Sequence, residues 1–266
     1  MFTTNPFSIL AETVPPIALQ SFVIVMVALV IIGTLVDIIH KKNVKYFFEN
    51  AKKAKLSATK TLSAGEKISV ISKTIVSDIA TTSELGAGKR RVAHLLGMYG
   101  TILFWTGSVI MIFCYSSPSS DTPSYWPIIW HVGAIMTVVG GSWFWFFLRV
   151  DVYSEAHPWY RIIKADLFVL ALIASSLFGL IWSCLQFLNL NDRWDDKAFL
   201  VLYIISNLAL FGGVYWSKFA HMFYKPGASI QKNLAEADGS RDNLPPPADA
   251  PEQYGLGIDR EKAKHY

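Results

Sequence analysis

The chain has 266 residues, of which 52% are hydrophobic, and a formal net charge of +4. Its mean hydropathy is +0.35, and the apolar residues form long runs, which indicates a membrane protein rather than a large soluble core. The two cysteines, Cys114 and Cys184, are too few for an iron–sulfur cluster held by this chain alone, and they lack the paired spacing of a structural zinc site.

The first long apolar run covers residues 17–39 and follows a short polar lead at residues 1–16. A transmembrane helix needs about 20 apolar residues, so this run is long enough to cross a bilayer. The lead lacks the positive charges that open a cleaved signal peptide. We therefore expect a retained first span.

Residues 40–91 form a basic loop, with lysine or arginine at positions 41, 42, 45, 52, 53, 55, 60, 67, 73, 89, 90 and 91 and acids at 49, 66, 78 and 84. The positive-inside rule predicts that this loop is cytoplasmic. Ser63 and Glu66 have the spacing of a helix-capping box, and isoleucines then follow at helical spacing at positions 68, 71, 75 and 79. This pattern predicts an amphipathic helix that lies on the membrane surface or under a partner. Tethering between two spans disfavours a nucleic-acid-binding role for the lysines.

Four more spans are expected within residues 92–225, at 92–115, about 127–148, about 162–188 and 198 to about 223. With a cytoplasmic first loop, five spans place the N-terminus outside, in the periplasm, and the C-terminus inside. The expected fold is therefore an all-α integral membrane protein with a five-helix transmembrane bundle.

The tail, residues 226–266, is polar and contains Pro245-Pro246-Pro247. It is poor in apolar residues, so we expect it to be flexible or docked onto a partner in the cytoplasm. Its segment Tyr254–Arg260 is a candidate docking motif.

Two histidines are candidate cofactor ligands. His94 opens the second expected span and His221 closes the last, so the topology places both near the inner membrane boundary. Two imidazoles at one depth, on different helices, can bind a haem iron from both faces. The glycines Gly97 and Gly100 would leave room for a porphyrin. The alternative is that both histidines are interfacial polar residues with no ligand role.

Other charged and polar residues fit around these two histidines. Arg90, Arg91 and Lys218 could pair with haem propionates. His157 lies in an aromatic inner loop and is either a reserve ligand or a residue that orders the loop. His131, near the outer end of the third span, is expected to form hydrogen bonds within the bundle, and a role toward protons or quinone is the alternative.

A resemblance to a known family rests on two motifs. Arg91-Val92-Ala93-His94-Leu95, continued by Tyr99-Gly100, and Ser217-Lys218-Phe219-Ala220-His221 resemble the nitrate reductase gamma-like cytochrome b subunits. Within that group, the chain looks most like the membrane subunits of heterodisulfide reductase. Because it is short and has a long polar tail, it also resembles the membrane anchors of adenylylsulfate reductase in sulfur-oxidising bacteria.

The resemblance covers roughly residues 60–225 and implies a b-type haem bound by His94 and His221. The family pattern has further histidines for a second haem, but Phe104 stands at one corresponding place and no histidine lies near Tyr203 at the other. One haem is therefore expected.

The function that this implies is a non-catalytic electron-transfer subunit of the bacterial cytoplasmic membrane. It would dock a cytoplasmic flavin/iron–sulfur oxidoreductase through the basic loop, the loop at residues 149–161 and the tail, and would exchange electrons with membrane quinone. No nucleophile or acid–base constellation stands out that would predict catalytic residues. The alternatives are a haem-free membrane anchor for the same enzyme and, with less support, a small transporter, for which broken helices or repeated halves are expected.

Overall fold

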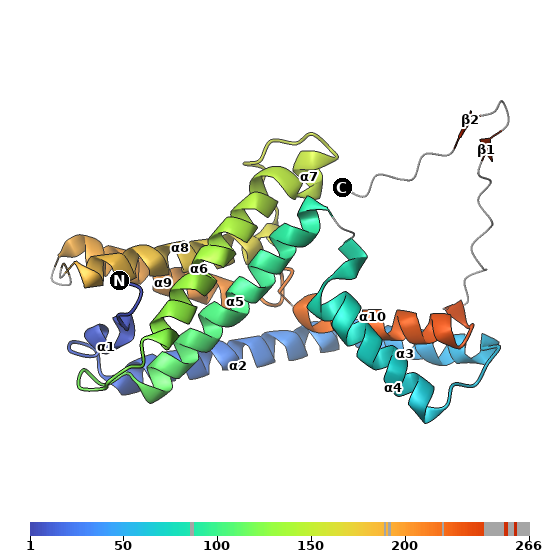
Figure 1. Ribbon diagram of the computed structural model, residues 1–266, viewed down its shortest axis with the longest axis horizontal. Coiled ribbons are helices and arrows are strands. Elements are labelled where there is room, and N and C mark those ends of the chain that lie inside the picture. Colours follow the sequence, from blue (N-terminus) through green and yellow to red (C-terminus); the bar gives the residue numbers. More distant parts are fainter. Residues whose placement is uncertain are drawn as a thin grey trace. The chain divides into compact units, whose positions relative to one another are not determined.

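The computed structural model describes residues 1–85, 88–188, 190, 193–219, 221–241, 253–254 and 258–259, almost all of them helical (Figure 1). The α-helices are α1 (Pro6–Leu10), α2 (Pro16–Lys41), α3 (Asn43–Ala54), α4 (Ala64–Thr74), α5 (Lys89–Cys114), α6 (Tyr125–Trp143), α7 (Val150–Tyr153), α8 (Leu167–Phe187), α9 (Trp194–Gly212) and α10 (His221–Ala237). Short 3-10 or π-helical segments are η1 (Lys55–Ser57), η2 (Ile75–Ala80), η3 (Ser83–Leu85), η4 (Phe144–Leu148) and η5 (Lys164–Asp166), and two short strands are β1 (Gln253–Tyr254) and β2 (Ile258–Asp259).

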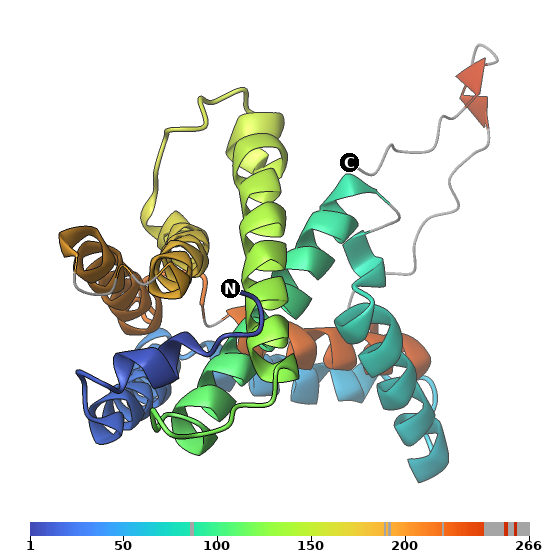
Figure 2. The same cartoon turned by 60° about the vertical axis from the view of Figure 1, so that its left-hand side comes forward.

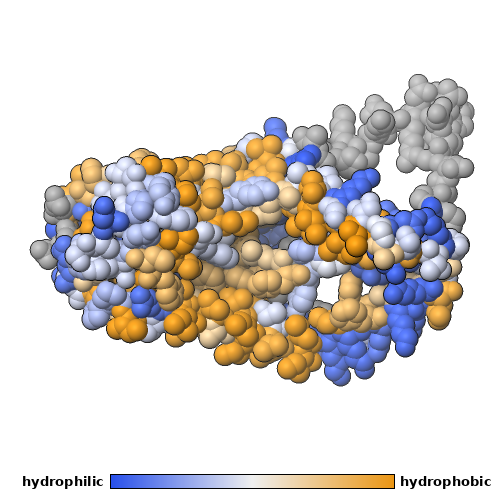
Figure 3. Space-filling view, turned by 60° about the horizontal axis from the view of Figure 1, so that its bottom comes forward, coloured by the Kyte–Doolittle hydropathy of each residue, from blue (hydrophilic) through white to orange (hydrophobic). Residues whose placement is uncertain are grey.

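The chain divides into two compact units. Unit 1 comprises residues 1–39 and 92–220, and unit 2 comprises residues 40–91 and 221–266. In the space-filling view, hydrophobic surface is broad over the long helices of unit 1, whereas hydrophilic surface gathers over the helices of unit 2 (Figure 3). The expected contrast between apolar spans and a polar loop is thus visible at the level of the fold.

Within the described ranges, four helices are long and apolar enough to cross a membrane: Pro16–Lys41, Lys89–Cys114, Tyr125–Tyr153 and Lys164–Phe187. They coincide with the first four expected spans, and their length and composition indicate a membrane protein. The fifth candidate, α9, begins with Asp195, Asp196 and Lys197 in its first turn. These charges keep α9 out of this set of four.

The expected fifth span is wrong in its extent. α9 ends at Gly212 rather than near Phe223, and helix resumes only at His221. Two consecutive glycines, Gly212 and Gly213, stand at this end, and glycine has the lowest helix propensity of any residue except proline. A Cβ at Gly213 would lie 2.6 Å from the Ala209 carbonyl oxygen, so a larger residue would not fit there without a shift.

Side chains from distant segments meet at one end of unit 1. Asn5 caps α1 by accepting from the Phe7 amide, and its Nδ2 donates to the Tyr115 carbonyl at 2.9 Å. Phe7 then packs on Trp130 and Trp182, with ring centroids 5.9 and 5.6 Å apart. The N-terminus, the end of α5, the start of α6 and the end of α8 therefore share one end of the unit, as consecutive antiparallel crossings require.

Glycines allow a close approach of α5 and α6, which run side by side in Figure 1 and are seen from another side in Figure 2. A Cβ at Gly133 would lie 2.5 Å from the Phe104 amide nitrogen, and one at Gly140 would lie 2.6 Å from that of Gly97. Any side chain at these two positions of α6 would meet the backbone of α5. Small residues at crossing points are the usual means by which membrane helices pack without a hydrophobic driving force.

In unit 2, the predicted capping box is confirmed at the start of α4. The Ser63 hydroxyl accepts from the Glu66 amide at 3.3 Å, and a Glu66 carboxylate oxygen accepts from the Ser63 amide at 2.8 Å. Lys60 donates to the other Glu66 oxygen at 2.7 Å. These contacts begin α4, which continues into the π-helical segment η2.

The expectation of a flexible tail from Pro226 is wrong for residues 226–237. They belong to α10, which packs against α4 and η2 within unit 2. The loop before α4 also contacts the end of α10, because the amides of Thr59 and Lys60 both donate to the Asp238 carbonyl. Of the expected docking motif, Tyr254 lies in β1 and Ile258–Asp259 form β2, which pair as two antiparallel strands; Pro245-Pro246-Pro247 and the remaining motif residues lie outside the described residues.

Candidate functional site

His94 lies in the second turn of α5, in unit 1, and its side chain is exposed. One turn further along α5, a Cβ at Gly97 would meet nothing within 4 Å, so space is open there. At Gly100 the expectation of room for a porphyrin is wrong. A Cβ at Gly100 would lie 2.6 Å from the Thr137 amide nitrogen of α6, so this glycine serves helix packing instead.

His221 is the first residue of α10 and belongs to unit 2; its side chain lies outside the described residues. The premise that His221 closes a continuous membrane helix is not met, because α9 ends at Gly212. Phe219, two residues earlier, is buried in unit 1 and stacks on Trp105 with ring centroids 6.1 Å apart. Trp105 is 11 residues beyond His94, or about 16 Å along the helix.

The three expected propionate partners belong to different units. Arg90 and Arg91 are in unit 2, and Lys218 is in unit 1, where its side chain is exposed. Nε of Arg91 donates to the Thr81 carbonyl at 2.7 Å. This bond fixes the start of α5 to Thr81, directly after η2.

The two other candidate histidines lie in contrasting surroundings. His131 is fully buried, with Nδ1 2.7 Å from the Pro127 carbonyl and Nε2 2.8 Å from the Ser183 hydroxyl. Both ring nitrogens are therefore engaged within the bundle, as expected. His157 lies in the exposed loop after α7, 3.5 Å from a Glu155 carboxylate oxygen, and its amide donates to the Asp151 carbonyl. The latter bond orders the loop, while the reserve-ligand role stays a prediction.

A buried ion pair holds this same loop. Arg149 donates from Nη1 to Oδ2 of Asp166 at 2.7 Å and from Nη2 to the carbonyls of Trp159 and Arg161. Both side chains of the pair are at most 9% exposed. The guanidinium also lies 4.0 Å over the Trp145 ring. The sequence pattern did not predict this pair, which joins residues 17 positions apart.

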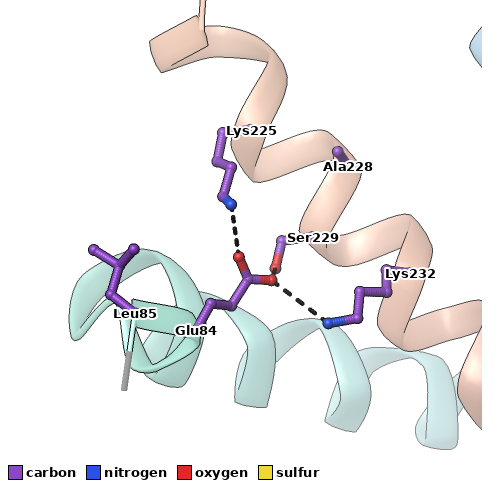
Figure 4. Close-up of a pocket in the computed structure, with 6 residues that line it drawn as sticks. All are labelled: Glu84, Leu85, Lys225, Ala228, Ser229 and Lys232. Atoms are coloured by element: carbon purple, nitrogen blue, oxygen red, sulfur yellow. Dashed lines mark hydrogen bonds and ion pairs between the residues drawn. The ribbon is translucent and has the colours of Figure 1, made fainter. Parts of the chain in front are cut away.

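Unit 2 contains a second polar cluster that the sequence did not reveal. Glu84 of η3 accepts from Lys225 at 2.8 Å and from the buried Ser229 at 3.1 Å, and Lys232 lies 3.9 Å away (Figure 4). These side chains line a shallow pocket of about 440 Å³ together with Leu85 and Ala228. Hydrogen bonding to Lys225 lowers the pKa of Glu84 below its ordinary value.

Asp78 is the other centre of this cluster. Its carboxylate accepts from Ser77, Ser83, Ser229 and Asn233, at 2.7 to 3.2 Å. The hydrogen bond from Ser83 is the main cause that lowers the pKa of Asp78 to about 2. The only advance signal was that Asp78 and Glu84 are two of the four acids in an otherwise basic loop. Because both carboxylates are fully engaged in holding α10, the cluster has a structural role.

Among the described residues, no group of three or more histidine, cysteine, aspartate or glutamate side chains is placed to hold a metal ion. A haem with two axial histidines needs only two such residues, so the haem prediction is untouched by this finding.

Comparisons with models of protein families, with curated proteins and with solved structures found no match.

Proposed function

We propose that this protein is a non-catalytic membrane subunit that anchors a cytoplasmic flavin/iron–sulfur oxidoreductase, adenylylsulfate reductase, to the bacterial cytoplasmic membrane. It exchanges electrons between that enzyme and quinone through one haem b. The observation that supports the anchoring role is the division of the chain. Unit 1 contains four apolar helices of membrane-spanning length, and unit 2 gathers the lysine-rich loop into separate, polar helices.

His94 and His221 are the proposed haem ligands, and Arg90, Arg91 and Lys218 the proposed propionate partners. The exposed imidazole of His94 and the open space at Gly97 fit a haem on this side of α5. A bound haem b would supply a one-electron carrier between the enzyme and quinone. The protein's own residues would hold it, set its environment and keep it at the inner boundary.

The test is a reduced-minus-oxidised absorption spectrum of the purified full-length protein. We expect a b-type band that is lost in His94→Ala and in His221→Ala. His40→Ala, an exposed histidine at the end of α2, and His131→Ala should both keep the band. A band that survives both ligand substitutions would refute the ligand assignment, and His157→Ala would then be the next variant to measure.

The second candidate function is a haem-free anchor for the same enzyme. Two observations favour it. The space beside Gly100 is filled by α6, and α9 ends before His221. The same spectrum decides between the two, because a wild-type protein without any b-type band supports the haem-free anchor.

Enzyme docking is tested separately by co-purification of adenylylsulfate reductase with the full chain. A truncation after Arg241 removes the end of the tail and leaves α10 intact. We expect reduced recovery of the enzyme if the tail takes part in docking, and full loss when Lys52, Lys53 and Lys55 are replaced by glutamate. Unchanged recovery in both variants would argue against docking through unit 2.

A further inference from the structure

The helical segment formed by α4 and η2 has its polar side buried and its apolar side exposed. Thr74 is 1% exposed, and its hydroxyl accepts from Asn233 of α10 at 2.8 Å. Asp78, one turn later on the same side, accepts from Asn233 and Ser229. In a soluble protein an amphipathic helix normally packs its apolar side inward. Here the inward side is the polar one.

Next to these polar residues around the helix, the segment carries an isoleucine stripe, which we define as Ile68, Ile75, Val76 and Ile79. Ile68 is 64% exposed, Ile75 46% and Val76 64%, whereas Ile79 is partly covered. Residues 68 and 75 fall within about 20° of one another around a helix of 3.6 residues per turn. Exposed apolar side chains gathered along one helix indicate a surface that meets something apolar.

The chain on either side of the stripe indicates a membrane surface as the occupant. α3 begins two residues after the membrane-span candidate α2 ends, and the span candidate α5 begins at Lys89, shortly after η3. The C-terminal end of the segment is therefore a short stretch from a span candidate, and its N-terminal end is joined to α2 through α3 and η1. Lys67 precedes the stripe and is exposed, as are Lys41, Lys42 and Lys45 at the start of the loop. Lysines next to a span and on an amphipathic helix are attracted to anionic lipid headgroups.

We propose that the isoleucine stripe inserts into the headgroup region of the membrane that holds this protein, with the surrounding lysines paired to anionic phospholipid. α10 then covers the polar side of the helix, which in a simple interfacial helix would face water. This inference depends on membrane insertion alone and not on haem, quinone or the redox partner.

Environment-sensitive labelling tests this proposal in the full chain reconstituted into vesicles. Cys114 and Cys184 are first replaced by alanine, and a single cysteine carrying a fluorophore is placed by Ile75→Cys or, as the matched control, by Lys73→Cys. The two positions are about 160° apart around the helix, and both are exposed. We expect a blue shift of emission, and quenching by lipids that carry a spin label, for Ile75→Cys only. Both signals should be stronger in vesicles that contain phosphatidylglycerol than in phosphatidylcholine alone.

Three results would overturn the proposal. The first is a water-like emission for both labels in both kinds of vesicle. The second is a shift at Ile75→Cys that appears only after a soluble protein partner is added, which would assign the stripe to that partner. The third is an equal shift in anionic and neutral vesicles, which would remove the role of the lysines. The haem spectrum of the unlabelled protein is unaffected by each of these outcomes.

Discussion

Single glycines decide how closely α5 and α6 approach. A Cβ at Gly133 would lie 2.7 Å from the Gly100 carbonyl oxygen and 2.5 Å from the Phe104 amide nitrogen. Backbone atoms cannot rotate away as a side-chain end can, so Gly133→Ala must separate the two helices. Overpacking of this kind costs about 1–3 kcal/mol. We expect a lower thermal unfolding midpoint for Gly133→Ala in detergent.

Gly97→Ala is the matched control on the facing helix. Its added Cβ meets nothing within 4 Å, and alanine has a higher helix propensity than glycine. The unfolding midpoint should stay the same or rise. An equal loss in both variants would mean that the close crossing at Gly133 does not set the stability.

Arg149 and Asp166 provide a second prediction at the scale of residues. Removing one partner of a buried ion pair leaves an uncompensated charge and typically costs about 3–5 kcal/mol. Asp166→Ala should therefore destabilise the protein strongly and release the loop at residues 149–166 to limited proteolysis. Arg161→Ala removes an exposed side chain but keeps the carbonyl that accepts from Arg149, so its cleavage rate should match the wild type. A resistant loop in Asp166→Ala would show that the pair does not hold it.

At the scale of elements, the contact between α10 and the α4–η2 segment rests mainly on carboxylates. Asp78 and Glu84 both have a pKa below the ordinary value, and that of Asp78 falls from 3.8 to about 2. Between about pH 5 and 2, the unfolded state therefore binds more protons than the folded state. The stabilisation that they provide is complete above about pH 5 and is lost as the pH falls toward 2.

Hydrogen exchange of the α10 amides, corrected for the intrinsic rate at each pH, measures this loss. We expect protection to be constant at neutral pH and to fall between about pH 5 and 2. Asp78→Asn should lower protection already at pH 7 and flatten the pH profile. Glu49→Gln changes an exposed carboxyl that lies 3.7 Å from Lys45, and its profile should follow that of the wild type. Protection in Asp78→Asn equal to the wild type would argue against the cluster as the source of stability.

These elements show which parts of the structure the sequence could predict. The capping box at Ser63 and Glu66 depends on residues three apart, and the four apolar helices depend on composition alone, so both could be predicted. The bonds from Asp78 to Ser229 and Asn233 join residues about 150 positions apart. No local pattern records such pairs. The helix of α10 was missed for the same reason, because its stability comes from that partner rather than from its own apolar residues.

At the scale of the whole molecule, the number of membrane spans depends on whether α9 crosses the membrane. Its 19 residues extend about 28 Å, close to the roughly 30 Å of a bilayer core. The charged first turn is compatible with a crossing if it lies at the outer interface, where Asp196 accepts from Gln186 at 3.0 Å. The end of α9 at Gly212 would then lie at the inner interface. A fifth crossing places residue 218 on the side opposite to residue 193.

Labelling of single cysteines with a membrane-impermeant maleimide tests the fifth crossing in intact cells and inverted vesicles. In a background without Cys114 and Cys184, we expect Arg193→Cys to react only from outside and Lys218→Cys only from inside, since both side chains are exposed. Lys53→Cys, in the basic loop, serves as the inside reference, and Ser119→Cys, between α5 and α6, serves as the outside reference. If Lys218→Cys reacts from the same side as Arg193→Cys, then α9 does not cross and the bundle has four spans. The proposed placement of His221 at the inner boundary would then fail with it, because the chain would reach unit 2 from the wrong side of the membrane.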